Sequence, residues 1–430
     1  MLLLLLACAD ADSGSKSDSP ADTAAPEDTG VEDIPTDSGP DSAVDTAPPV
    51  DTSVDTALDT AVVDTADTGE GATPIDCARE AMSFDHEGEL SSDTTWCAID
   101  TVLVRGPVTV AGGVHLAIEA GTTVHATWGT DGSAGELIIG QGATIDAVGT
   151  EDTPIVIRPL GDGTDSTEFE GLEVVGYGRS PENPSDDPSE GSGVLSYIRV
   201  EYGGNTDAAI HFVAVGDGTE VDHLASIYSY DDAFEFDGGE VGAKYLVAYD
   251  FADDGYQFED GYDGHLHHCL ASDGGGAGIT VRNRDPDDGG GNSDEPRTYA
   301  NVNNFTIVDT YSEGIYLDNG GQGEFTNMLV SSPADCTLKI DDASVENVDE
   351  GIELGFAVLW QADTTFCLTD DGVDITGYAH DYVVADPLLD GYEPDATSPA
   401  WDPAYIDEDD DDQVGAFSDW DWSNGWGVPE

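Results

Sequence analysis

A block of about 22 residues returns along the middle of the chain, and this repeat constrains the fold more than any other feature. The segment "YSYDDAFEF" (228–236) is followed by "YDFADDGYQF" (249–258), so a pair of adjacent aspartates comes back one block later. Phe212, Phe236 and Phe258 are separated by 24 and 22 residues. Each block holds short alternating apolar stretches between polar turns, and this period is typical of a parallel β-solenoid. We therefore predict an all-β chain folded as a parallel β-helix, with about 22 residues per coil.

Alternation within each block predicts which side chains face the interior. The inward pairs are Ile210 and Phe212, Phe234 and Phe236, Tyr256 and Phe258, Ile279 and Val281, and Ile315 and Leu317. The residues between them form an outward column of His211, Glu235, Gln257, Thr280 and Tyr316. Glycine and asparagine at the corners, as in "EYGGN" and "DNGG", permit tight bends between strands. Propeller blades are the structural alternative, but they need about 40 residues per repeat.

The repeat also predicts the domain boundaries. Coils extend over residues 101–385, preceded by an N-terminal cap at 76–100 and followed by a C-terminal cap at 386–430. A polar insertion at 284–298 accounts for the one long interval between blocks. We expect the tryptophans of the tail to cover the apolar end of the solenoid, since such ends must be capped. Stacking of these tryptophans on sugar rings is the alternative.

Charge excludes two classes of partner. The net charge is −80, from 91 acidic and 11 basic residues. A chain without a basic face does not bind nucleic acid, which needs its phosphates neutralised, and it does not dock electrostatically on anionic lipid. Two interpretations of the acidity remain: a well-solvated extracellular surface, or a chain that takes divalent cations.

The N-terminal segment predicts a tethered protein. Residues 9–75 are a low-complexity tract of Asp, Thr, Ser, Ala and Pro, which we expect to be a disordered, extended linker. Before it, "MLLLLLAC" (1–8) resembles the lipobox of bacterial lipoproteins, and this resemblance implies acylation of Cys8. The apolar run is short and has no preceding Lys or Arg, so we expect that the true start lies upstream or that the segment was trimmed.

Five further cysteines fall into two groups. Cys77 with Cys97 and Cys336 with Cys367 are the local pairings, which we favour among the three connectivities that four cysteines allow. Disulfides fit an oxidising, extracellular compartment. Cys269 is left over, and we expect a buried free thiol rather than a nucleophile.

Several segments resemble a known family. They include "GTEDTPIVI" (149–157), "SGVLSYIRVEYGG" (192–204), "DDAFEFDGG" (231–239), "EPRTYANVNNFTIV" (295–308) and "VGAFSDWDWSNGWG" (414–427). They are similar to segments of right-handed parallel β-helix proteins of the pectate-lyase-like superfamily, in particular surface lipoproteins of Gram-negative bacteria. The resemblance implies a right-handed β-helix at the outer membrane or cell surface, or secreted, and it implies no established enzymatic activity.

The repeated aspartates predict a candidate metal site. One coil places Asp253 above Asp231 and Asp254 above Asp232, ~4.8 Å apart. Like charges at that distance cost ~3–4 kcal/mol at an effective dielectric of 20, so the side chains either splay into water or share a cation. Calcium suits such a site, because it accepts 6–8 oxygens in flexible geometry.

An enzymatic alternative rests on a second resemblance. "NTD" (205–207) followed by "DD" (231–232) is similar to motifs of polygalacturonase-type glycoside hydrolases, and implies Asp207, Asp231 and Asp232 as catalytic carboxylates. The next coil has "DDG" (253–255) where those enzymes have Gly-His-Gly, and their Arg-Ile-Lys motif is absent. Lyase chemistry would instead need a basic residue on the same face, for which the candidates are Arg199, Arg282, Arg284 and Lys244.

The sequence therefore predicts a monomeric, lipid-anchored surface β-helix that binds glycans or matrix, with calcium at the aspartate corner. The ligand-binding residues are not specified by the sequence. The alternative is a polysaccharide-degrading hydrolase or lyase, and a purely structural role as a spacer also remains open.

Overall fold

The computed structural model describes residues 77–161, 168–181, 187–284, 291, 295–346, 351–361, 364–369, 372–406, 413–417, 422–423 and 425–428. The lipidation site at Cys8, the linker at 9–75, Trp420 and the acidic run at 407–412 lie outside these residues. No helix in the described part of the chain combines the length and apolar character that a bilayer-spanning segment needs.

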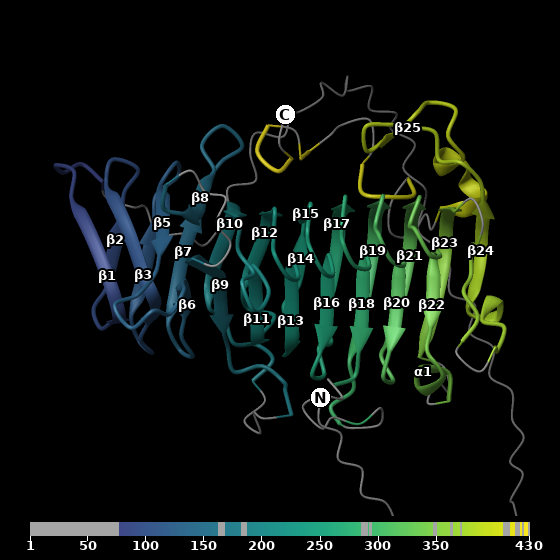
Figure 1. The fold of residues 1–430 in the computed structure, drawn as a ribbon, viewed down its shortest axis with the longest axis horizontal. Coiled ribbons are helices and arrows are strands. Elements are labelled where there is room, and N and C mark those ends of the chain that lie inside the picture. The colour runs from purple at the N-terminus through teal and green to yellow at the C-terminus, as the bar shows by residue number, and fades with distance from the viewer. Residues whose placement is uncertain are drawn as a thin grey trace, which may run out of the picture. The chain divides into compact units, whose positions relative to one another are not determined.

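The regular secondary structure of the described chain is almost entirely β-strand, as predicted. The strands are β1 (Ser83–Leu90), β2 (Thr94–Trp96), β3 (Thr101–Val110), β4 (His115–Ile118), β5 (Thr123–Thr127), β6 (Gly135–Ile139), β7 (Thr144–Val148), β8 (Ile155–Pro159), β9 (Phe169–Val175), β10 (Gly193–Glu201), β11 (Ile210–Val215), β12 (Glu220–Ile227), β13 (Phe234–Gly239), β14 (Ala243–Lys244), β15 (Val247–Tyr249), β16 (Tyr256–Glu259), β17 (His265–Ser272), β18 (Ile279–Arg282), β19 (Tyr299–Val308), β20 (Ile315–Asp318), β21 (Gln322–Ser331), β22 (Leu338–Ile340), β23 (Ile352–Trp360), β24 (Ala379–Val384), β25 (Leu389–Asp390) and β26 (Glu393–Pro394). The helical elements are α1 (Asp342–Glu346), η2 (Thr376–Tyr378), η3 (Pro399–Trp401) and η4 (Pro403–Tyr405). Strands β1 to β24 pair in parallel, which confirms the parallel β-helix (Figure 1).

Each coil contributes strand segments to three parallel sheets. The first sheet contains β2, β4, β7, β14 and the leading parts of β10, β12, β17, β19, β21 and β23. The second contains β5, β8, β15 and the trailing parts of the same long strands. The third contains β6, β9, β11, β13, β16, β18, β20 and β22, and carries the candidate site.

The core is a set of stacked ladders, one residue from each coil. Phe212, Phe236 and Phe258 are in register in the third sheet and fully buried. Their ring centroids are 5.2 Å apart at each step. All ten inward residues predicted from the alternation are buried, because strands stacked one coil apart keep the same side chains on the same face.

The bend between the first and second sheets contains non-glycine residues in an unusual backbone conformation. In successive coils it places one residue at a positive φ, namely Tyr197, His223, Tyr245, His268, Asn304, Asn327, Phe356 and Asp381. This conformation is unfavourable for bulky residues. The first four rings, however, stack at centroid distances of 4.1, 4.6 and 5.2 Å, and this packing offsets the strain.

The two ends of the β-helix differ from the predicted boundaries. β1 and β2 pair with β3 and β4, so the first coil already lies within the predicted cap at 76–100. The last parallel strand, β24, ends at Val384, close to the predicted 385. Phe366, Tyr378 and Tyr382 pack against the end of the core. The side chains that cover this end therefore precede the predicted cap at 386–430.

The tail runs back along the side of the coils, where the yellow end of the chain lies in Figure 1. We call its described residues between 399 and 428 the C-terminal strap. One part packs on β21 and β23, through Ala400, Ile406 and Val414 against Leu329 and Val358. The next part packs on β12, β15 and β17, through Ala416, Phe417, Trp422 and Trp426 against Ala225, Ile227, Val247 and Leu270. The expectation that the tail tryptophans cover the solenoid end is thus wrong for Trp422 and Trp426, because the second sheet offers them an apolar outer face.

Candidate functional site

The repeated aspartates form a corner just before the third-sheet strands. The backbone N–H of Asp253 donates to the Asp231 carbonyl at 3.5 Å, and the N–H of Asp254 donates to the Asp232 carboxylate at 2.7 Å. The predicted stacking of the two Asp pairs in successive coils is therefore confirmed. We call Asp231, Asp232, Asp253 and Asp254 the aspartate corner.

Three of the four corner carboxylates converge. Oxygens of Asp231, Asp232 and Asp253 all lie within 4.8 Å of one another. Asp254 is turned toward the next coil, where its carboxylate accepts the N–H of Ala277 at 2.8 Å. Three carboxylates are thus placed to share one cation, while the fourth stabilises the stack.

Burial makes these charges unfavourable without a partner. Asp232 and Asp254 are 6% and 8% exposed. Burial, with the neighbouring Asp254, raises the pKa of Asp232 well above its usual range, and burial raises the pKa of Asp254 to about 6. Burial together with Asp253 also raises the pKa of Asp231. A bound cation or a proton would relieve this repulsion.

The outward column of the third sheet is the second candidate region. In register it runs Glu173, His211, Glu235, Gln257, Thr280, Tyr316 and Lys339, which confirms the predicted column and extends it at both ends. Its acidic end is deeply set, since His211 is 8% and Glu235 6% exposed. The column therefore changes from a half-buried Glu173, a buried His211 and a buried Glu235 to a lysine in β22.

His211 lies at the centre of a carboxylate cluster. Its Nε2 is 2.9 Å from Asp237 Oδ2, and its Nδ1 is 3.5 Å from Asp207 Oδ2 and 4.0 Å from Glu173 Oε2. Burial alone would lower the pKa of His211, but hydrogen bonding to Asp207 and Asp237 raises it well above its usual value. We call Glu173, Asp207, His211, Glu235 and Asp237 the His211 cluster.

Two carboxyls of this cluster have pKa values shifted in opposite directions. Oxygens of Asp207 and Glu235 lie within 4.8 Å of each other. Burial and the charge of Asp237 raise the pKa of Glu235 well above its usual range. Burial opposes ionisation of Asp207 too, but hydrogen bonds with His211 and Glu235 lower its pKa overall. The cluster therefore favours the protonated form of Glu235 and the ionised form of Asp207.

The three carboxylates predicted from the hydrolase resemblance are divided between these regions. Asp231 and Asp232 converge in the aspartate corner, whereas Asp207 belongs to the His211 cluster. His211 and Glu235 were predicted in the outward column, but no role was predicted for them. The signal for Asp237 was its position in the next strand, two residues beyond Glu235 and so on the same face.

The basic residues considered for lyase chemistry are dispersed. Arg282 ends β18, a strand of the third sheet, and lies 3.9 Å from Glu259. Arg284 is 3.6 Å from Asp260. Arg199 belongs to β10 and pairs with Glu201 at 2.5 Å, and Lys244 in β14 lies over the Tyr245 ring. Of these four, Arg282 alone lies in a third-sheet strand.

A cavity of about 440 Å³ lies beside the far end of the column. It is lined by Glu313, Ala334, Asp335, Lys339, Gln361, Thr364, Cys367 and Leu368. The Lys339 ammonium is 3.0 Å from Glu313 and lies over the Tyr316 ring at 4.2 Å. The cavity offers a polar, partly cationic surface beside an exposed leucine.

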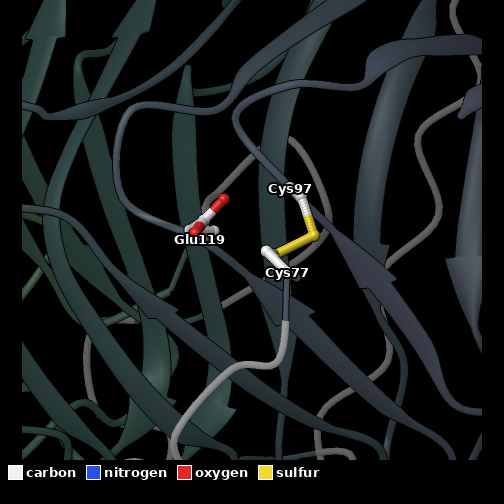
Figure 2. Close-up of side chains that lie close together, drawn as sticks. All are labelled: Cys77, Cys97 and Glu119. Atoms are coloured by element: carbon white, nitrogen blue, oxygen red, sulfur yellow. A yellow bond between two sulfur atoms is a disulfide. The ribbon is translucent and has the colours of Figure 1, made fainter. Parts of the chain in front are cut away.

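The cysteines serve structure. Disulfides join Cys77 to Cys97 and Cys336 to Cys367, the pairings favoured from the sequence. Figure 2 shows Glu119 beside the first of these, but sulfurs joined to each other are not thiolate ligands, so this group is no metal site. Cys269 is buried, as expected, and burial raises the pKa of its thiol far above the usual value, which makes it unreactive.

Comparison with known proteins identifies a family. The family model of the pectate-lyase-like beta helix domain matches residues 88–359, more than half of the chain. No curated protein matches significantly, and neither does any solved structure.

Proposed function

The chain belongs to the pectate-lyase-like β-helix family, and from this premise we propose a lipid-anchored surface protein that binds glycans or matrix at a calcium-loaded aspartate corner. A lipid on Cys8 would hold it at the outer membrane or cell surface, and the linker at 9–75 would space the β-helix from the bilayer. The observation that carries the proposal is the convergence of Asp231, Asp232 and Asp253 within 4.8 Å.

Exposed aromatic rings flank this corner. Tyr230 directly precedes Asp231 and is 42% exposed. Tyr311 is 79% exposed and lies two coils beyond Asp253, since the N–H of Gly276 bonds the Asp253 carbonyl and the N–H of Ser312 bonds the Gly276 carbonyl. A tyrosine presents an apolar face and a hydroxyl, which suits stacking on a sugar ring. A calcium ion between two such rings would complete a glycan-binding surface by accepting sugar hydroxyls or carboxylates as further ligands.

One of the converging groups is too buried to act in cleavage. Asp232 is 6% exposed and its carboxylate accepts a backbone N–H, while Asp231 is half-buried and Asp253 is exposed. A small ion can reach oxygens that a polysaccharide cannot. This difference makes binding the function that the corner supports best.

Calcium should stabilise the fold through the corner. At free calcium 100 times its dissociation constant, binding to the folded state alone adds about 2.7 kcal/mol. We expect a higher Tm with calcium than with a chelator at equal ionic strength, and no difference in Asp231→Asn/Asp253→Asn. The control Asp217→Asn/Asp390→Asn removes the same charge from exposed positions and should keep the calcium response. Equal Tm values for the unmodified protein in both buffers would contradict calcium binding at the corner.

Glycan capture should depend on the same corner. On an array of neutral and acidic polysaccharides, we expect binding with calcium and loss of binding with a chelator. Tyr311→Ala should weaken the best ligand about tenfold, or ~1.4 kcal/mol, whereas Tyr177→Ala, an exposed tyrosine elsewhere, should not. Capture that is unchanged by chelator and by Tyr311→Ala would place the ligand at another surface.

A second candidate function is polysaccharide cleavage, which one observation favours. Oxygens of Asp207 and Glu235 lie within 4.8 Å of each other, and their pKa values are shifted in opposite directions, as in the acid and base pairs of polysaccharide hydrolases. If the chain is a hydrolase, Asp207→Asn should lower cleavage by about 10²–10⁴-fold, measured as new reducing ends from pectic and other acidic polysaccharides. The absence of products from the unmodified chain would rule against this candidate for those substrates.

A further inference from the structure

We infer that His211, Asp207, Glu235 and Glu173 form a binding site for a first-row divalent transition metal such as Zn²⁺ or Mn²⁺. This site is separate from the aspartate corner and does not depend on the proposed glycan binding. Its donors come from three successive coils, through β9, β11, the turn before β11, and β13.

The orientation of the imidazole is the first argument. His211 is 92% buried, and Asp237 Oδ2 lies 2.9 Å from its Nε2. Because a carboxylate accepts a hydrogen bond, Nε2 carries a proton, and Nδ1 is the nitrogen that would give up its own proton to bind a metal. Nδ1 is a buried atom without a hydrogen-bond partner among the described residues. A histidine held by a carboxylate on one nitrogen and open on the other is the usual arrangement of a metal ligand.

The distance across the cluster is the second argument. Nδ1 faces Asp207 Oδ2 at 3.5 Å. A lone pair opposite a carboxylate is repulsive unless a positive species lies between them. A charge-assisted N–H···O bond would bring the two atoms to about 2.7–2.9 Å. Two ligands on a tetrahedral ion with bonds of about 2.0–2.1 Å lie about 3.4 Å apart. The observed separation is that of two ligands of one ion.

The remaining donors complete the set. A Glu235 oxygen lies within 4.8 Å of the His211 and Asp207 donors, and Glu173 Oε2 is 4.0 Å from Nδ1. One imidazole nitrogen with carboxylate oxygens suits zinc, manganese or iron, whereas calcium prefers oxygen ligands alone. Asp237 is then a positioning residue, since it orients the ring without contacting the ion.

Zinc titration of the full chain tests this site. The protein is stripped with a chelator, saturated with calcium so that the aspartate corner is filled, and titrated with Zn²⁺ by calorimetry. We expect one bound equivalent and a shift of one histidine ring nitrogen in the spectrum of ¹⁵N-histidine-labelled protein. His211→Gln should abolish both, and Asp237→Asn should weaken binding about 10–100-fold.

Two controls locate the metal. His380 also lies between two carboxylates, at 2.6 Å from Glu353 and 3.0 Å from Asp381, but its side chain is 44% exposed. His380→Gln should therefore leave zinc binding unchanged. Asp231→Asn/Asp253→Asn should leave it unchanged as well, and a loss there would overturn the separate site.

Other outcomes would overturn the inference directly. They are the absence of a bound equivalent in the presence of calcium, and an unaltered affinity in His211→Gln. If His211→Gln fails to fold, as judged by circular dichroism, Asp207→Asn and Asp237→Asn decide the question. Unaltered zinc affinity in both of these variants would overturn the site.

Discussion

Replacing Trp426 by alanine is expected to lower the free energy of unfolding by about 3–5 kcal/mol, the cost of removing a buried aromatic side chain. Trp426 is fully buried on the outer side of the coils. Its indole packs edge-on against Tyr197 and His223, with ring centroids 5.3 and 5.6 Å away, and its N–H donates to the Trp422 carbonyl at 2.7 Å. Truncation opens a cavity between the C-terminal strap and the second sheet.

Denaturant unfolding of the full chain measures this loss. Trp128→Ala is the matched control, because it removes the same indole from a side chain that is 39% exposed. We expect the control to cost less than half as much. The Trp426 variant should also bind a hydrophobic dye in its native state, since the strap no longer seals the apolar patch on β12, β15 and β17. If Trp426→Ala and Trp128→Ala lose the same free energy of unfolding to within 1 kcal/mol, the strap adds little to stability.

The position of the strap could not be predicted from the tryptophans alone. Arg199 donates to the Trp426 carbonyl across 227 residues of sequence, and no periodic pattern connects them. A usable signal lay elsewhere, in strands that are apolar on both faces. In "HLASI" (223–227), Leu224 packs in the main core while Ala225 and Ile227 pack under the strap. Near-continuous apolar strands indicate a sheet covered on both sides, and the sequence therefore contained evidence of a cover but not its identity.

The interior of the β-helix was predictable because its contacts are made between neighbouring coils. Each coil touches only its neighbours, so a period and an alternation are enough to assign the inward ladders. The bends were less predictable. Glycine and asparagine were expected there, and Gly204 and Gly320 indeed have positive φ. Tyr197 and His223 adopt it as well, against their intrinsic preference, because stacking between adjacent coils supports them, and Phe356 adopts it with an edge-on contact to His380.

In the candidate sites, too, some positions follow from the repeat and others do not. That Asp253 lies above Asp231 follows from the repeat. That Asp254 turns to the Ala277 N–H, away from the other corner carboxylates, depends on side-chain rotamers that the repeat does not specify. The His211 cluster joins Asp207, which precedes its strand, to Asp237, which follows Glu235 in the next strand. Such a cluster requires the register of three coils at once, and spacing within one coil does not reveal it.

Phe236→Ala is expected to have the second large effect, again about 3–5 kcal/mol. The Phe236 ring is fully buried at the middle of a ladder, with centroids 5.2 Å from those of Phe212 and Phe258. The Tyr262 ring is also 5.2 Å away. Removal of the Phe236 ring therefore weakens two coil-to-coil interfaces at once. Phe236→Leu keeps most of the volume and should cost less than ~1.5 kcal/mol.

The number of unfolding transitions in Phe236→Ala is more informative than its total loss of unfolding free energy. In a solenoid, stability is approximately the sum of each coil's own stability and its interfaces with its neighbours. A break at β13 should therefore uncouple the coils before it from those after it, and denaturant unfolding should change from one transition to two. Hydrogen exchange should lose protection first in β11, β13 and β16, where the ladder is interrupted, while β19 and β21 keep theirs. A single transition shifted to lower denaturant, with protection lost evenly along the chain, would contradict this. It would show that contacts spanning many coils, foremost those of the C-terminal strap, make the β-helix unfold as one unit.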